Sequence, residues 1–157
     1  MTIIFYYSVT GTNASIARTI GAGLNAETRE VRSVRKYSFL GMVFGSRMKI
    51  RFPIQPIEID LSRYDSLVLC APVWAGGPAC QMMTFVDKAQ LKGKKVAVVF
   101  GCGALQPARA LGIIRAALEA KGATVAAGEI LDVGKLKGEA LTKATQDLTA
   151  ALARELS

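Results

Sequence analysis

The stretch TIIFYYSVTGTNASIARTIGAGL, residues 2–24, decides the fold because it joins a strand pattern directly to a helix pattern. Residues 2–7 are mostly β-branched or aromatic, which predicts a buried strand. Apolar residues then recur at helical spacing over 14–24. A short polar turn at 8–13 separates the two patterns. A strand that leads straight into a helix is the first half of a β–α–β unit, so this stretch predicts a parallel sheet.

The same alternation continues to the end of the chain and predicts an α/β fold. Further strand patterns occupy residues 27–32, 65–72, 94–101 and 124–131. Helix patterns begin after Ala79 and at Pro107, and a last one spans 138–155. Three of the strands are nearly all apolar, which is typical of parallel strands covered on both faces. We therefore expect residues 1–157 to form a single domain, with a parallel sheet and helices on both of its faces.

Residues 33–63 depart from this alternation, at a place where a simple crossover helix is expected. They contain the segment YSFLGMVFGSRMKIRF (37–52), which is apolar and basic at once. We predict that its apolar side chains pack on their own domain or pair two subunits, in preference to lying on a membrane. The reason is that Gly41 and Gly45 break any long amphipathic helix.

Excess basic charge is concentrated in the same part of the chain. The whole chain has a formal net charge of +8. Residues 29–51 contain seven basic residues against Glu30 alone, which is a net +6. This charge forms either a solvated face or a docking surface for an acidic partner or an anionic membrane. In the docking interpretation, the side chains available to an acidic redox partner are Arg47, Lys49 and Arg51.

The chain has no histidine, which excludes every mechanism and metal site that requires one. Its three cysteines, Cys70, Cys80 and Cys102, form no Cys-x-x-Cys pair, so we expect no metal site. If the chain is an enzyme, a cofactor carries the difficult step, and we assign no catalytic side chain. No apolar run approaches the roughly 20 residues of a membrane-spanning helix. We expect a cytoplasmic protein with no transmembrane segment and no nucleic-acid partner.

Three loops follow the carboxyl ends of predicted strands, where open α/β sheets bind their ligands. The first loop combines hydroxyls with a helix N-terminus and has no cation, so it can hold a phosphate through O–H and N–H donors. Its candidate residues are Ser8, Val9, Thr10, Gly11, Thr12 and Asn13. The alternative is a plain helix N-cap supplied by Asn13. A P-loop is excluded because no Gly-Lys-Ser/Thr follows.

The second loop contains the single tryptophan of the chain among small residues. Its candidate residues are Pro72, Val73, Trp74, Ala75, Gly76 and Gly77. Trp74 lies in a glycine-rich loop outside any predicted strand, so its ring either flanks a flat aromatic ligand or plugs the core. The two glycines let the backbone approach such a ligand closely.

The third loop, GCGALQ (101–106), almost matches a dinucleotide-binding G-x-G-x-x-G motif. Gln106 replaces the last glycine and Asp132 comes late for a ribose-binding acid, so we disfavour that interpretation. We expect the backbone amides of Gly101, Cys102 and Gly103 to face the polar edge of the ligand. An alternative brings Cys80 and Cys102 together as a functional thiol pair, although a reducing cytoplasm disfavours a disulfide between them.

The segment SVTGTN (8–13) resembles the phosphate loop of the flavodoxins, Ser/Thr-x-Thr-Gly-x-Thr, with Asn13 in place of the last threonine. The order of strands, helices and loops extends this resemblance over almost the whole chain. It implies a flavodoxin-like three-layer sandwich with strand order 2-1-3-4-5 and FMN as the cofactor. The FMN phosphate would lie on residues 8–13 and its ring between loops 72–78 and 101–106. It also implies a peptide flip at Gly76-Gly77 that is linked to reduction of the flavin.

A second segment, PVWAGGPACQMMTFVD (72–87), resembles the flavodoxin-like quinone reductases. The matching residues are Pro72, Gly76 or Gly77, Gln81, Met82, Phe85 and Asp87. For Met82 and Phe85, packing in the core is the favoured explanation. Flavodoxins are usually acidic whereas this chain is basic, which leaves the redox partner open.

We therefore favour an FMN-binding protein that acts in electron transfer with a redox partner protein, for which the basic charge favours an acidic surface. The first alternative is an FMN-dependent NAD(P)H:quinone oxidoreductase, which would use NAD(P)H and a quinone and form a homodimer. The second alternative is a non-redox binding module that docks through its basic face.

Overall fold

The computed structural model describes residues 1–103 and 106–157, which alternate between strands and helices. The helices are α1 (Thr12–Leu24), α2 (Phe39–Arg47), α3 (Cys80–Lys88), α4 (Pro107–Ala120) and α5 (Gly138–Leu156), with a single 3₁₀ turn at Leu61–Arg63. The strands are β1 (Thr2–Tyr6), β2 (Glu27–Glu30), β3 (Ser66–Ala71), β4 (Val73–Trp74), β5 (Gly77–Pro78), β6 (Lys95–Cys102) and β7 (Thr124–Asp132).

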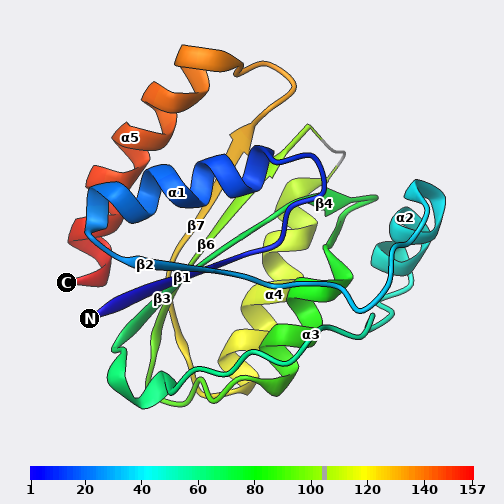
Figure 1. Cartoon of the computed structure of the whole chain (residues 1–157), viewed down its shortest axis with the longest axis horizontal. Coiled ribbons are helices and arrows are strands. Elements are labelled where there is room, and N and C mark those ends of the chain that lie inside the picture. The colour runs from blue at the N-terminus through cyan, green and yellow to red at the C-terminus, as the bar shows by residue number, and fades with distance from the viewer. Residues whose placement is uncertain (104–105) are drawn as a thin grey trace.

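Within the described residues, five strands form one parallel sheet in the order β2-β1-β3-β6-β7. Counted along the main sheet alone, this is the order 2-1-3-4-5, so the predicted topology is confirmed. Helices α1 and α5 cover one face, and α3 and α4 cover the other (Figure 1). The result is the expected three-layer α/β sandwich.

The two faces of the sheet are separated by the alternation of side chains along each strand. In β1, Ile3 and Phe5 point toward α3 and α4, whereas Ile4 points toward α1 and α5. All six residues of β3 are buried, because this strand lies in the middle of the sheet with a helical layer on each side. Phe5 packs against Phe85 of α3 with ring centroids 4.3 Å apart. Burial of one such side chain contributes about 1.5–3 kcal/mol.

Two local expectations are wrong. Trp74 lies in a strand after all, because β4 pairs with β5 in a two-stranded antiparallel hairpin. The turn between them places Ala75 at φ 49° and Gly76 at φ 75°, the left-handed pair that a tight hairpin requires. In addition, α2 runs through both Gly41 and Gly45, which were expected to break it.

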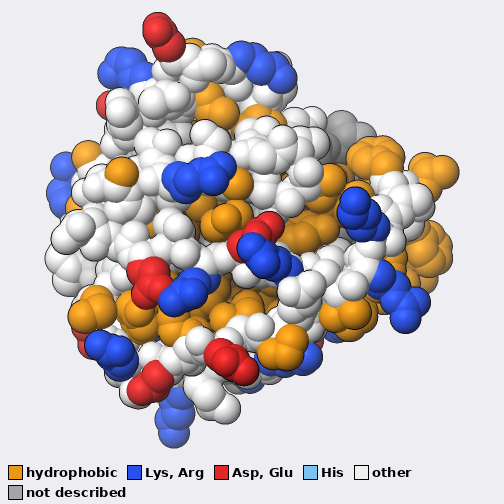
Figure 2. Space-filling model, in the orientation of Figure 1, with side chains coloured by type: hydrophobic (Ala, Val, Ile, Leu, Met, Phe, Trp, Pro, Cys, Tyr) orange, Lys and Arg blue, Asp and Glu red, His pale blue; other side chains and the backbone are white. Residues whose placement is uncertain are grey.

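Tertiary contacts explain why α2 forms despite its glycines. The side chain of Ser38 caps the helix, accepting from the Gly41 N–H at 3.1 Å. A Cβ at Gly45 would lie 2.6 Å from the ring of Phe52 and 3.0 Å from the sulfur of Cys80, so only glycine permits this close packing. The helix is held on its inner side, while its outer side projects from the body of the molecule (Figures 1 and 2).

Between α2 and β3, an extended segment takes the place of a crossover helix and packs against the core. An isolated bridge pairs Ser33 with Ile54, and the chain then runs extended toward β3. Ile54 is buried, and Ile57, Ile59 and Leu61 pack against the core on the α3–α4 face. No helix in the described part of the chain has the length and hydropathy needed to cross a membrane.

Replacing the core ring at Phe5 tests this description. We expect Phe5→Ala to lower the free energy of unfolding by about 3–5 kcal/mol, because it leaves a cavity beside Phe85. The same change at Phe44, which is exposed on α2, should shift stability by only about 0.5 kcal/mol. Urea denaturation followed by far-UV circular dichroism measures both values, and equal losses would contradict the described burial.

Candidate functional site

The three predicted loops lie together at one edge of the sheet. They follow the carboxyl ends of β1, β3 and β6, and β3 lies directly between the other two strands. Because all three strands are parallel, their carboxyl ends point the same way, as Figure 1 shows. Of the third loop, residues 104 and 105 lie outside the described residues. This edge is the place where an α/β sheet binds its ligands.

The first loop is a turn that presents donors to solvent. Gly11 has φ 91° and precedes the first residue of α1, and its N–H donates to the Ser8 hydroxyl at 3.1 Å. The hydroxyls of Thr10 and Thr12 lie 3.3 Å apart. The first intrahelical bond runs from the Ser15 N–H to the Gly11 carbonyl at 3.0 Å, so the N–H groups before it have no helical acceptor. The first loop thus combines hydroxyls with helix N–H groups and has no cationic side chain of its own, while Arg32, Arg35 and Lys36 line the same pocket as Ser8 and Val9.

Asn13 has a different role from the predicted ones. Its side chain is only 4% exposed and is turned toward β6. Its Nδ2 donates to the Gly101 carbonyl at 3.0 Å, and its Oδ1 accepts from the Gly101 N–H at 3.1 Å. The N-cap alternative is therefore wrong, since Gly11 is the N-cap residue and has no side chain to cap with. The side-chain amide of Asn13 instead fastens the first loop to the third.

This contact leaves the third loop with fewer backbone N–H groups available to a ligand. Gly101 and Cys102 belong to β6, and the N–H of Gly101 is already bonded to Asn13, so it is unavailable to a ligand. A Cβ at Gly101 would lie 2.8 Å from the Asn13 Oδ1, which explains why glycine is needed there. The expectation that the Gly101 amide faces a ligand is thus wrong. Gly103, which is exposed just after the strand, keeps that assignment.

Trp74 forms the wall of the second loop. Its half-buried ring meets the ring of Tyr7 edge-on, with centroids 6.3 Å apart and an interplanar angle of 85°. It packs against the core on that side and remains partly exposed on the rest of its surface. Burial raises the pKa of Tyr7 to about 12, and its hydroxyl donates to the sulfur of Met42 at 3.8 Å. The Tyr7 hydroxyl is therefore uncharged at physiological pH, and its ring packs against the indole of Trp74.

The hairpin that carries Trp74 is held from two sides. On one side, Arg109 of α4 donates from Nη1 to the Gly76 carbonyl at 2.9 Å. On the other, Gly77 lies directly against the Ser46 backbone of α2, with no room for a Cβ. Sequence reasoning did not find Arg109. The signal available was its position in the first turn of a helix that begins at the same edge of the sheet. The flip at Gly76-Gly77 remains a prediction, and any such flip must break the bond to Arg109.

The α3 residues shared with the quinone reductases make contacts within the chain. Met82 and Phe85 are in the core, as expected from their helical spacing. Gln81 is fully buried and donates to the Ser33 hydroxyl at 3.4 Å, while its Oε1 has no hydrogen-bond partner among the described residues. Asp87 forms an ion pair with Arg51, with Nε and Oδ2 2.6 Å apart.

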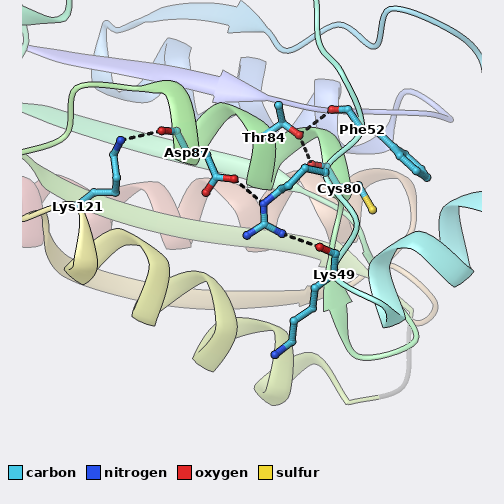
Figure 3. A network of polar contacts seen from close by, with 7 residues as sticks. Lys49, Phe52, Cys80, Thr84, Asp87 and Lys121 are labelled. Carbon is cyan, nitrogen blue, oxygen red and sulfur yellow. Dashed lines mark hydrogen bonds and ion pairs between the residues drawn. The ribbon is translucent and has the colours of Figure 1, made fainter.

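Figure 3 shows this network between the insertion and α3, in which Thr84 also donates to the Phe52 carbonyl at 2.6 Å. Arg51 is thus paired within the chain at an exposed position, and its availability to a partner stays a prediction. Cys80 lies against α2, with its sulfur 3.7 Å from the Ser46 hydroxyl, and burial raises the pKa of its thiol. No disulfide is formed by Cys70, Cys80 or Cys102.

Relatives and solved structures agree with this architecture. No protein-family model matches the chain. Flavodoxin 1 of Escherichia coli (strain K12) is 31% identical to it over 134 residues, which are 80% of this chain but only 65% of that relative. Flavodoxin 1 of Salmonella typhimurium gives the same values. The chain thus spans slightly less than two thirds of the curated relatives that it matches.

Three solved structures share the fold at low identity. A flavoprotein in complex with FMN from Lactobacillus acidophilus superposes with a TM-score of 0.72 and 22% identity, covering 82% of this chain and 91% of that one. Oxidised Flavodoxin 1 from Bacillus cereus superposes with a TM-score of 0.64 and 20% identity, covering 99% of both chains. A WrbA-like flavodoxin from Agrobacterium tumefaciens gives 0.62 and 16%, covering 99% of this chain and 98% of that one.

The contact between the first and third loops can be tested by removing the Asn13 amide. We expect Asn13→Ala to lower the free energy of unfolding by about 1–3 kcal/mol, because it leaves buried backbone groups of Gly101 without this partner. Ser15→Ala in the same helix is the control and should change stability by at most about 0.5 kcal/mol. Both are measured by urea denaturation. An Asn13→Ala variant as stable as the control would show that the clamp does not hold these loops together.

Proposed function

Because this chain belongs to the flavodoxin-like family, we propose that it binds FMN at the carboxyl edge of its sheet and transfers electrons to or from a redox partner protein. The observation that carries the proposal is the open N-terminus of α1, where the hydroxyls of Thr10 and Thr12 lie 3.3 Å apart and the first helix N–H groups have no helical acceptor. A phosphate supplies the acceptors and negative charge that such a terminus favours.

Each loop has a role in this proposal. The hydroxyls of Ser8, Thr10 and Thr12, with the N–H groups of the first turn of α1, hold the phosphate. Val9 and Gly11 shape that turn. Trp74 offers part of its ring to the flat cofactor, and its loop neighbours Pro72, Val73, Ala75, Gly76 and Gly77 form the surrounding wall. Cys102 and Gly103 lie at the far side of the site.

Bound FMN supplies the electron transfer, and the protein supplies the surroundings. Hydroxyls and amides place little negative charge near the ring, while Arg109 adds one positive charge behind the Gly76 carbonyl. Positive charge near a flavin favours its reduced, more negative forms. The net charge of +8 favours an acidic surface on the redox partner and speeds the encounter with it at low salt. Three thiols without a disulfide suit a cytoplasmic location, which is part of the same proposal.

An FMN-dependent NAD(P)H:quinone oxidoreductase, acting as a homodimer, is the alternative. Its support is the likeness in fold to the WrbA-like flavodoxin, whereas Gln81, Met82 and Phe85, which α3 shares with the quinone reductases, are buried. Steady oxidation of NADPH by the purified protein, without a separate reductase, would favour this enzyme. A purified protein that gains no flavin absorption after FMN is added would favour a non-redox binding module.

Phosphate recognition is tested by comparing FMN with riboflavin. Each charge-assisted hydrogen bond to the phosphate contributes about 1.5–3 kcal/mol, so FMN should bind at least roughly 100-fold more tightly. Thr10→Ala should weaken FMN far more than riboflavin, whereas Thr142→Ala, exposed on α5, should change neither. Quenching of flavin fluorescence measures the affinities of both flavins for the wild type and the two variants. Equal binding of the two flavins would refute the phosphate site.

The position of Trp74 is tested through its own fluorescence, since it is the only tryptophan. Its emission should fall as FMN saturates the protein. Trp74→Ala should lose about 0.5–1.5 kcal/mol of FMN binding beyond the loss of contact area, and Trp74→Phe should retain part of it. Unchanged emission at saturation would place the cofactor away from this ring.

A further inference from the structure

The outer side of α2 exposes a cluster of large apolar side chains. Phe39, Leu40, Phe44 and Met48 are 65%, 77%, 61% and 60% exposed, respectively, and we call them the α2 knob. The expectation that such side chains pack on their own domain is wrong for these four. The helix is attached by its other side, where Met42, Gly45 and Ser46 are buried. Figure 2 shows apolar side chains gathered on this protruding edge of the molecule. Contiguous exposed apolar groups of this size mark an interaction surface.

Exposed basic side chains flank the knob in the sequence. Arg35, Lys36, Arg47 and Lys49 are all exposed, and we call them the basic collar. Arg32 and Arg51 are not members, because their guanidinium groups bond to Glu30 and Asp87. The sequence contains no acidic residue from 31 to 57, so nothing nearby in the chain offsets this charge. The knob and the collar are therefore neighbouring exposed groups in the chain, one apolar and the other positively charged.

The combination of exposed apolar side chains and positive charge indicates what kind of partner binds this surface. A second copy of the chain would bring an identical collar and a net charge of +8 to the same contact, so a symmetric dimer is opposed by repulsion. An anionic bilayer meets both features, because apolar side chains enter the boundary of the acyl chains while lysines and arginines stay level with the phosphates. At about 1.5 Å per residue, a nine-residue helix is far too short to span a bilayer and suits one that lies at its surface.

We propose that α2 seats this protein on the surface of an anionic lipid bilayer. The knob enters the headgroup boundary and the collar contacts lipid phosphates. Two contacts on the inner side of the helix tie this surface to the candidate site, since Met42 contacts Tyr7 and Ser46 contacts Gly77. The seated protein therefore holds the edge that carries Trp74 beside the lipid.

Vesicle flotation tests the proposal without any cofactor, so its result is independent of the proposed FMN site. The purified protein is mixed with vesicles of phosphatidylcholine alone or of equal parts phosphatidylcholine and phosphatidylglycerol. We expect it to float with the anionic vesicles and to stay behind with the neutral ones. Failure to float with anionic vesicles would overturn the proposal and leave an acidic protein as the occupant of α2.

Matched variants separate docking by α2 from general attraction of a basic protein. Phe39→Ser, Leu40→Ser and Phe44→Ser together leave the charge unchanged and should weaken binding at least about tenfold. Arg35→Glu, Lys36→Glu and Lys49→Glu together should weaken it roughly 100-fold. The control reverses Lys137, Lys143 and Arg154, which are exposed on or next to α5. Three reversals change the net charge by −6, so the collar variant and the control both have a net charge of +2. The control should nevertheless retain most of the binding.

Three further results would each refute docking through α2. They are undiminished binding by the serine variant, equal losses in the two charge variants, and a wild-type dimer in light scattering that the serine variant converts to monomers. Because all these positions are exposed, thermal unfolding should show each variant folded. A loss of binding with an unchanged melting temperature therefore supports the proposal.

Discussion

A parallel sheet must be covered on both faces, and the rest of this structure depends on how the chain meets that constraint. Helices α1 and α5 cover one face. On the other face, α3 and α4 are supplemented by the extended segment after Ile54, whose isoleucines pack on the core in place of a crossover helix. Pro53 and Pro56 oppose a helix in that segment. Because the extended segment helps to cover this face of the sheet, α2 does not need to pack on the sheet. Its large apolar side chains can therefore face outward.

Most of the sheet and its covering helices could be predicted from the sequence, because their signals are local. Apolar runs and helical periodicity fall within the elements themselves, so the observed ends differ from the expected ones by only a few residues. The hairpin of β4 and β5 and the helix α2 could not be found in this way. Each strand of the hairpin has two residues and exists only through its pairing. In α2, the intrinsic cost of glycine is overcome by the close packing of Gly45 against Phe52 and Cys80.

The location of the candidate site was predictable, but the direction of its side chains was not. Topology alone brings the ends of β1, β3 and β6 together. The inward turn of Asn13 depends on a peptide 88 residues away, and that peptide loses its N–H to the contact. In the same way, Arg51 turns to Asp87 and Arg109 turns to the Gly76 carbonyl. Such choices are made by tertiary partners that no short motif contains.

The insertion and the candidate site are adjacent but differ in the chemical groups that they present. The first loop relies on neutral donors and a helix N-terminus, whereas the basic collar relies on exposed cations that salt can screen. Between them lie Met42, Tyr7 and Trp74, a continuous set of apolar contacts from α2 to the site. These contacts are made by uncharged side chains, and they fix the position of α2 relative to the candidate site. A surface that draws this protein to an anionic layer would therefore hold the proposed site close to that layer, and Arg35 and Lys36 of the collar line the same pocket as Ser8 and Val9 of the first loop.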